Sequence, residues 1–279
     1  MRELGLSAVG RLVIVTMPHW IDLDGAANVR DVGGLPTDGG ATTAFNRLIR
    51  ADNLQGLSTT DIRRLVDEHG VRTIADLRTG VEVDSEGPGP MTREPAVTIV
   101  HLSLFPEAGR NTDVAAARAA DAPVVLPWKE IEREKRQSSG IAGVYLGYLE
   151  DRADSIIAAL RLIGGSDGAT IVHCAAGKDR TGTVVALALA EVGVSHEAII
   201  ADYAASADRI TEVFARLRTS HTYADDIEGE DVAKHTPQAV SMQRLLEAMD
   251  EYFGGAPRWL RDHGWTEQDA AALRTKLLS

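Results

Sequence analysis

The sequence predicts an α/β protein in which a central sheet is flanked by helices. Short apolar runs typical of buried strands alternate along the chain with amphipathic segments typical of helices. The chain has 279 residues, and 44% of them are hydrophobic, which is enough for one large core. Neither an internal repeat nor a low-complexity linker divides it. We therefore expect a single α/β domain that carries a smaller helical subdomain.

The first half of the chain holds most of the predicted strands. Ser58 can cap a helix that Gly70 ends. Residues 105–140 are irregular and rich in alanine and charge, and we interpret them as an insertion. The predicted strands are Leu48–Ala51, Val71–Leu77 and Val97–Leu104.

The second half is mainly helical. One further strand, Ala169–His173, leads through a short loop into an apolar helix over Thr181–Val192. Residues 204–255 have a helical pattern that a charged stretch interrupts, and two helices folded as a hairpin would suit it. The other predicted helices are Ile141–Ile163, one capped by Ser195, and two within Pro257–Ser279, the last of them capped by Thr266.

Residues 1–17 are interpreted as a flexible extension of a domain that spans residues 18–279. The extension is mildly apolar, but it carries Arg2 and Arg11 and lacks a small-residue cleavage site, so we do not expect a cleaved signal peptide. Met17 is an alternative start of translation. No stretch of the sequence is long and apolar enough to span a membrane. We expect a cytoplasmic protein, or one that is secreted without a recognisable signal peptide.

The composition argues against several classes of function. Asp and Glu number 41 against 29 Lys and Arg, and the resulting net charge of −12 disfavours nonspecific binding to nucleic acid or anionic membranes. The eight histidines are scattered, and none pairs at the spacing of helical metal ligands, so we expect no metal and no cofactor. Cys174 is the single cysteine, so it cannot form an intrachain disulfide.

The stretch around Cys174 combines a strand end, a loop and the start of a helix. It reads Ile-Val-His-Cys-Ala-Ala-Gly-Lys-Asp-Arg-Thr-Gly-Thr over residues 171–183. Loop N–H groups can converge on a bound oxyanion, and the start of a helix adds about half a positive charge. A thiol in such a setting loses its proton more readily than a free cysteine does.

The spacing of Cys174 and Arg180 suits phosphoryl transfer. The five residues between them can wrap around a tetrahedral dianion, and the guanidinium offers a planar fork for two of its oxygens. Cys174 would attack phosphorus to form a phosphocysteine, which water then hydrolyses. A carboxylic acid must protonate the leaving oxygen and later activate the water. The structural alternative is a buried cysteine in a strand-to-helix turn beside a surface arginine.

The segment His173–Gly182 resembles the signature loop of the cysteine-dependent protein tyrosine phosphatases. More narrowly, it is similar to the loop of atypical bacterial tyrosine and dual-specificity phosphatases with a Gly-Lys-Asp-Arg-Thr sequence. The segment Asn28–Gly34 resembles the N-terminal motif of that family, although Val29 stands where phenylalanine is usual. The resemblance begins near Trp20 and runs to the C-terminus, and it implies a phosphatase fold with a helical lid over a deep site. Two further segments match, Ala75–Arg78 and Trp259–Asp262.

The resemblance implies a role for each residue of the loop. Cys174 is the nucleophile, and Arg180 binds the phosphate. His173 orients the loop and favours the thiolate, although a buried histidine at a strand end is an equal reading of this residue. Thr181 hydrogen-bonds the sulfur, or serves only as a helix-start residue. The residues implied to bind the substrate are Ala175, Ala176, Gly177, Lys178 and Thr181.

Two carboxyl groups are candidates for the general acid. The resemblance implies that Asp179, in the loop itself, is the acid, and Asp76 would then hydrogen-bond the loop or Arg180. We interpret Glu82 and Asp84 as solvated loop residues. Three other charged residues either line the site or form surface ion pairs: Arg30, Asp31 and Arg78.

Residues 204–255 are the candidate for the helical lid. Their aromatic and apolar side chains could cover the site or belong to the ordinary core. The side chains in question, with the residue just before this segment, are Tyr203, Phe214, Tyr223, Met242 and Leu246.

The expected function is hydrolysis of phosphotyrosine in proteins, with phosphoserine and phosphothreonine as further candidates. Lys178 is a second cation in the loop and suits substrates with additional phosphates, so a phosphoinositide phosphatase is the alternative. A noncatalytic phosphoprotein-binding module is a second alternative, against which the intact set of Cys174, Asp179 and Arg180 argues. The continuation Gly-Lys-Asp-Arg-Thr-Gly argues against a rhodanese or an arsenate reductase. The sequence leaves the oligomeric state and the physiological substrate open.

Overall fold

The computed structural model describes residues 4–6, 12–14, 17–106 and 143–279. A six-stranded sheet forms its centre. The strands are β3 (His19–Trp20), β4 (Arg30–Asp31), β5 (Leu48–Ala51), β6 (Val71–Asp76), β7 (Thr98–His101) and β8 (Ala169–His173). Their order in the sheet is β3-β4-β5-β8-β6-β7. The last four are parallel to one another, whereas β4 is antiparallel to both of its neighbours.

The predicted α/β class is confirmed, and the four predicted strands are present. β5 and β8 have the predicted bounds, β6 ends one residue early, and β7 is shorter than the predicted segment. β3 and β4 were not predicted, because a strand of two residues is too short to show a periodic pattern.

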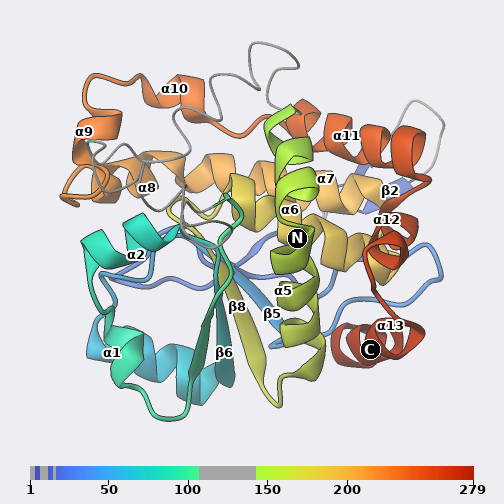
Figure 1. The fold of residues 1–279 in the computed structure, drawn as a ribbon, viewed down its shortest axis with the longest axis horizontal. Helices are drawn as coiled ribbons and strands as arrows, with labels where there is room; N and C mark the ends of the chain where they lie inside the picture. The colour runs from blue at the N-terminus through green and yellow to red at the C-terminus, as the bar shows by residue number, and fades with distance from the viewer. Residues whose placement is uncertain (1–3, 7–11, 15–16, 107–142) are drawn as a thin grey trace, which may run out of the picture.

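Helices cover both faces of the sheet (Figure 1). On one face, α1 (Thr59–Arg63) continues as a π-helical turn over Arg64–Glu68, and Leu65 packs there with β6 and β8. Ser58 caps α1 through its side chain, as predicted. The other face carries the larger core. Its helices include α5 (Ala153–Gly165), α6 (Asp179–Glu191), α7 (His196–Ala205), α12 (Ala256–Asp262) and α13 (Glu267–Leu277).

The long helix predicted over Ile141–Ile163 is wrong as a single element. Residues 143–151 are helical, but Arg152 has φ −137° and ψ 41°, and α5 starts only after it. The Arg152 side chain holds this break by donating hydrogen bonds to Asp154, Ser155 and the Phe105 carbonyl. The apolar periodicity continues across the break, so the sequence pattern does not reveal it.

Residues 204–255 contain several short helices instead of the predicted two-helix hairpin. In Figure 1, α8, α9 and α10 lie toward the upper end of the view, whereas α1 and α13 lie at the lower end. α11 packs instead against α7 within the main core. The elements are a 3-10 turn at Ser206–Arg209, α8 (Ile210–Leu217), α9 (Ala224–Ile227), α10 (Val232–His235), α11 (Ala239–Ala248) and a π-helical turn at Met249–Phe253.

The two ends of the chain differ in how far the predictions can be compared with the structure. At the C-terminal end, two helices follow Gly255, and Thr266 caps α13 in a capping box with Asp269, as predicted. Within residues 1–17, β1 (Leu4–Leu6) pairs antiparallel with β2 (Leu12–Ile14). The predicted insertion at 105–140 lies almost wholly outside the described residues. None of the described helices has the length and hydropathy needed to cross a membrane.

Candidate active site

The segment that follows β8 stands at the carboxyl edge of the sheet. His173, the last residue of β8, pairs with Ala51 of β5 on one side and with Asp76 of β6 on the other. Since these parallel strands end at the same edge, the segments after each of them meet there. α6 begins at Asp179, so residues 174–178 form the connection, which we call the Cys174 loop.

Gly177 lets this loop approach the backbone that follows β5. Its φ of +65° is a conformation that other residues rarely adopt. A Cβ atom there would lie 2.5 Å from the Ala51 carbonyl oxygen and 2.6 Å from the Asp52 nitrogen. Both are backbone atoms of a buried segment, so neither can move aside alone. Glycine is therefore required at this position for two independent reasons.

The carbonyl groups of the Cys174 loop are held on its outer side. The Asn53 N–H donates to the Ala175 carbonyl at 3.0 Å. The Asn28 side-chain amide donates to the Ala176 and Gly177 carbonyls at 3.0 and 3.2 Å. Arg50 adds a second hydrogen bond to the Gly177 carbonyl at 2.9 Å.

This arrangement turns the N–H groups of the loop inward. In a trans peptide, the N–H of the next residue points away from the carbonyl, so the N–H groups of Ala176, Gly177 and Lys178 face the side opposite their partners. None of these three donates a hydrogen bond to a residue that the structure describes. The start of α6, a helix of 13 residues, adds its own N–H groups and partial positive charge. The loop is thus built to bind an oxyanion.

A buried ionic network supports the loop from behind. The Asp202 carboxylate accepts a hydrogen bond from Arg30 Nε at 2.9 Å and one from Arg50 Nη1 at 2.5 Å. Arg30 also donates to the Asn28 side-chain oxygen. The Arg30 side chain is 0% exposed, so its prediction as a surface or site-lining residue is wrong. Asp31 is also no lining residue, because its carboxylate accepts backbone N–H groups of neighbouring turns.

Buried groups around the Cys174 loop set the charge states of Arg180 and His173. Cys174 is buried. Burial alone would lower the pKa of Arg180, but the charges of Glu82 and Cys174 raise it well above its usual range. Burial lowers the pKa of His173 to about 4, against the opposing effect of Asp76, so the ring is neutral near pH 7. The neutral His173 ring adds no positive charge at the Cys174 loop, whereas Arg180 and the start of α6 do. His173 contacts the loop through Nδ1, which lies 3.4 Å from the Cys174 carbonyl oxygen.

Glu82 fixes the position of Arg180. Its two carboxylate oxygens accept hydrogen bonds from Arg180 Nη1 at 2.6 Å and Nη2 at 2.9 Å. The same carboxylate accepts the Thr79 N–H in the capping box of α2 (Gly80–Glu86) and the Tyr223 hydroxyl. Glu82 is 0% exposed, so the prediction of a solvated loop residue is wrong. No sequence pattern indicated the pair of Glu82 and Arg180, because the Thr-x-x-Glu spacing marks only the capping box that joins Glu82 to Thr79.

Both oxygens of the Asp76 carboxylate accept hydrogen bonds from Arg78. Arg78 donates to it through Nε at 3.0 Å, through Nη2 at 2.6 Å and through its backbone N–H. Burial alone would raise the pKa of Asp76, but His173 and Arg78 lower it well below its usual range. Arg78 is therefore a buried partner of Asp76. A carboxylate held in this way is a poor proton donor.

Asp179 stands at the first position of α6 with a partner at each oxygen. Tyr145 donates its hydroxyl proton to Oδ1 at 2.6 Å, and the Lys178 Nζ lies 3.3 Å from Oδ2. Lys178 also donates to the His235 carbonyl of α10 at 2.9 Å. In this conformation, the Lys178 ammonium is thus directed toward α10 and Asp179.

Thr181 does not make the hydrogen bond that the resemblance implies. Its hydroxyl is fully buried and has no hydrogen-bond partner among the residues that the structure describes. The predicted contact with the Cys174 sulfur is therefore wrong for this conformation, in which Thr181 lies in the first turn of α6.

The segment from α8 to α10 packs directly on the Cys174 loop. Phe214 and Tyr223 form a small cluster with Ala175, and Ala176 packs against its edge. The other candidate lid side chains lie in the main core instead: Tyr203, Met242 and Leu246. Only the part of the candidate lid up to α10 therefore contacts the loop through these side chains.

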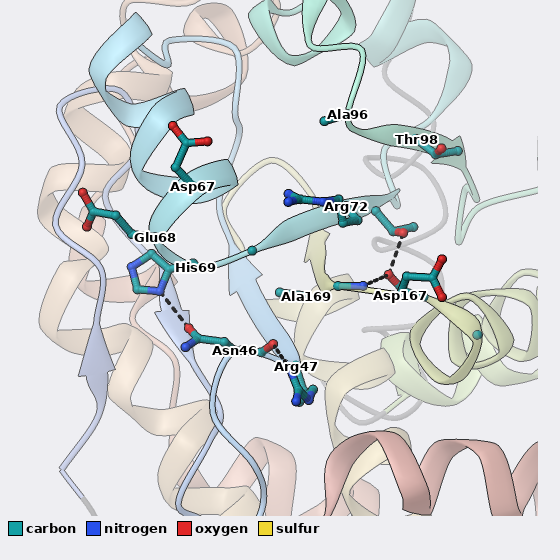
Figure 2. Close-up of a pocket in the computed structure, with 15 residues that line it drawn as sticks. Asn46, Arg47, Asp67, Glu68, His69, Arg72, Ala96, Thr98, Asp167 and Ala169 are labelled. Carbon is teal, nitrogen blue, oxygen red and sulfur yellow. Dashed lines mark hydrogen bonds between the residues drawn. The ribbon is translucent and has the colours of Figure 1, made fainter.

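A cavity lies at the edge of the sheet opposite the Cys174 loop, where the parallel strands begin (Figure 2). It has a volume of about 700 Å³ and is lined by residues at the amino ends of β6, β7 and β8. Its side chains mix carboxylates with Arg47 and Arg72, and a hydrogen bond joins His69 to Asn46. It holds no nucleophilic thiol. In the described parts of the chain, no three His, Cys, Asp or Glu side chains lie close enough to hold a metal ion.

A buried thiol, an arginine held by a carboxylate, and inward N–H groups at a helix start together define a cysteine-dependent phosphatase. Residues 21–279 match the model of the tyrosine phosphatase family, so the chain belongs to that family. The family resemblance and the enzymatic class predicted from the sequence are confirmed, and the protein is a phosphatase.

Named relatives support this assignment. The chain is 29% identical over 282 residues to the "Triple specificity protein phosphatase PtpB" of Mycobacterium tuberculosis, which covers 92% of this chain and 98% of the relative. It is 26% identical to a "Tyrosine-protein phosphatase" of Nostoc commune, over 98% of this chain and 94% of the relative. A solved structure, "Crystal Structure of PTPMT1 in complex with PI(5)P", aligns at 18% identity with a TM-score of 0.29. That alignment covers 61% of this chain and 94% of the other.

Proposed function

We propose that this phosphatase hydrolyses phosphotyrosine in proteins, with Cys174 as the nucleophile. The observation that supports this most is the orientation of the Cys174 loop. Its outward carbonyl groups are held by Asn28, Arg50 and Asn53, which leaves the N–H groups for the phosphoryl oxygens. Arg180, held by Glu82, adds the charge that the transition state requires.

The proposed reaction has two steps. In the first, the Cys174 thiolate attacks phosphorus, the bond from phosphorus to the tyrosine oxygen breaks, and Asp179 gives its proton to that oxygen. In the second, water attacks phosphorus, the S–P bond breaks, and Asp179 takes a proton from the water. The thiolate and the protonated acid are then restored, and inorganic phosphate leaves.

We assign the acid to Asp179 rather than Asp76. Asp76 is held as a carboxylate by Arg78, whereas the Asp179 side chain is 22% exposed at the start of α6. The comparison of Asp179→Asn with Asp76→Asn tests this assignment. Only Asp179→Asn should remove the basic limb of the pH–rate profile for phosphotyrosine. Loss of that limb in Asp76→Asn alone would reverse the assignment.

The same site could act on phosphoinositides, and the name of the mycobacterial relative records triple specificity. Lys178 is the residue that would contact a second phosphate, but in this structure its ammonium is bonded to the His235 carbonyl. We therefore place phosphotyrosine first. Lys178→Met should reduce turnover of phosphoinositides more than turnover of a phosphotyrosyl peptide if Lys178 reads an additional phosphate.

Turnover of a substrate panel tests the proposed function as a whole. Phosphotyrosyl, phosphoseryl and phosphothreonyl peptides and phosphoinositides are each assayed for phosphate release, with Cys174→Ser as the control. We expect Cys174-dependent release that is fastest with phosphotyrosine. Binding of phosphopeptides without any release would support the noncatalytic alternative.

We place the protein in the cytoplasm, or outside the cell after export without a cleaved signal peptide, and immunoblots of cell and culture fractions separate these locations.

A further inference from the structure

Two tyrosine hydroxyls form a chain that ends on the Asp179 carboxylate. Tyr145 Oη lies 2.6 Å from Asp179 Oδ1 and 2.6 Å from Tyr203 Oη. Tyr145 belongs to the helical residues 143–151, Tyr203 to α7 and Asp179 to α6. Three separate elements thus converge on one carboxyl group.

The direction of the hydrogen bonds in this chain follows from the number of protons. A phenol has one O–H, and Tyr145 gives its proton to Asp179 Oδ1. The Tyr203 proton must then point to the Tyr145 oxygen. Burial and the charge of Asp179 raise the pKa of Tyr145 well above its usual range, and burial also raises the pKa of Tyr203. Both hydroxyls therefore remain donors wherever the enzyme would work.

Burial of the two rings does not by itself explain the third member of the chain. Tyr145 and Tyr203 are 0% and 2% exposed, and the two hydroxyls could satisfy each other within the core. The additional hydrogen bond from Tyr145 goes to the Asp179 side chain, which is 22% exposed at the start of α6. Without it, the Asp179 side chain would be free to turn toward the backbone N–H groups at the start of α6, which attract carboxylates.

We propose that Tyr145 is a positioning residue for Asp179 and that Tyr203 in turn holds Tyr145. The inference rests on the proposed function, in which Asp179 is the general acid. Because Oδ1 is the acceptor of the Tyr145 proton, the transferable proton of Asp179 is carried by Oδ2. The hydroxyl chain thus selects which oxygen faces the leaving group. After the transfer, the Lys178 ammonium, 3.3 Å from Oδ2, stabilises the new carboxylate.

The leaving group offers a readout that a purely structural role would not affect. Proton donation matters for a poor leaving group, such as the phenolate of phenyl phosphate, and much less for the stabilised anion released from p-nitrophenyl phosphate. Tyr145→Phe keeps the ring and removes only the hydroxyl. We expect it to lower kcat/KM, which reports the first step alone, about tenfold for phenyl phosphate, the equivalent of one hydrogen bond, and less than about twofold for p-nitrophenyl phosphate. Tyr203→Phe should give the same pattern with a smaller loss.

A double-mutant cycle with Asp179→Asn completes the test. In the Asp179→Asn background, Tyr145→Phe should cost no further activity, because the group through which it acts has lost its proton. An equal loss in both backgrounds, or equal losses on the two substrates, would overturn the proposal and leave the assignment of the acid intact. If Asp179→Asn alone showed no preference between the two leaving groups, the assignment of the acid would fail, and this inference with it. Thermal unfolding of each variant shows whether the fold is retained.

Discussion

Replacing Gly177 by alanine probes how closely the Cys174 loop must fit against the end of β5. The added Cβ would lie 2.5 Å from the Ala51 carbonyl oxygen, whereas an ordinary contact begins at 3.4 Å. The loop must therefore move by about 0.9 Å, or Ala51 must move with the central strand that carries it. The φ of +65° adds strain of about 1–2 kcal/mol for any residue with a Cβ.

The movement would fall on the groups that bind the phosphoryl oxygens. A displacement of about 1 Å in a catalytic group can cost about 100-fold in rate, because the donors no longer meet the transition state. We therefore expect Gly177→Ala to lower kcat/KM for phosphotyrosine about 100-fold. Its free energy of unfolding should fall by at least the 1–2 kcal/mol of backbone strain.

Gly70 provides a matched control. It has the same φ of +65°, but a Cβ there would meet nothing within 4 Å. Gly70→Ala should thus show the backbone strain in urea unfolding and leave kcat/KM unchanged. The reasoning would be refuted if Gly177→Ala and Gly70→Ala had kcat/KM values within about threefold of each other, since the steric contact would then have no effect on the loop.

Three further predictions concern buried carboxylates. Glu82→Gln removes the charge that holds Arg180, so kcat/KM should fall about 100-fold and the free energy of unfolding by about 3–5 kcal/mol. Asp202→Asn leaves two buried guanidinium groups without their shared carboxylate, so it should destabilise the protein by at least about 3–5 kcal/mol in urea unfolding. Burial raises the pKa of Asp52 to about 6, above its value of about 4 in the unfolded chain. Protonation of Asp52 therefore stabilises the folded protein fully below about pH 4, and this stabilisation is lost as the pH rises through about 6. From pH 7.5 to pH 5, the wild type should gain roughly 1 kcal/mol more stability than Asp52→Asn does.

Each of these predictions has a clear contrary result. Asp84→Asn changes an exposed carboxylate on the same helix as Glu82, and equal activity losses in the two variants would remove the special role of Glu82. Glu197→Gln changes an exposed carboxylate on the same helix as Asp202, and equal losses of stability in the two variants would remove the special role of Asp202. Parallel stability–pH curves for the wild type and Asp52→Asn would show that Asp52 does not titrate as we expect.

Local sequence patterns predict the frame of the site. The apolar run of β8, the glycine in the loop and the apolar helix behind it place Cys174 and Arg180 correctly relative to the sheet. The capping residues Ser58 and Thr266 likewise mark helix starts, because a cap depends on residues only three positions apart. Such features depend on short-range spacing, so one sequence is enough to find them.

The charged partners of the site could not be predicted, because they are far apart in the sequence. Glu82 and Arg180 are separated by 98 residues, and Arg30 and Asp202 by 172. Glutamate and arginine are usually exposed, so without the fold an exposed position is the natural expectation for each. The convergence of β4, β5 and α7 behind the loop brings Arg30, Arg50 and Asp202 together, so each of these buried charges has a partner of opposite sign.

The anion-binding capacity of the Cys174 loop therefore belongs to the sheet as much as to the loop sequence. A free chain with the sequence Cys-Ala-Ala-Gly-Lys could turn its peptide groups either way, at a large cost in conformational entropy when one arrangement is selected. Here Asn28 and Arg50 bind the carbonyl groups from outside, and Asp202 fixes Arg50 through α7. The loop is thus preorganised before a phosphoryl group arrives, and the cost of ordering it is met during folding. It follows that substitutions behind the loop, at residues that never touch substrate, should lower catalysis through the same N–H groups.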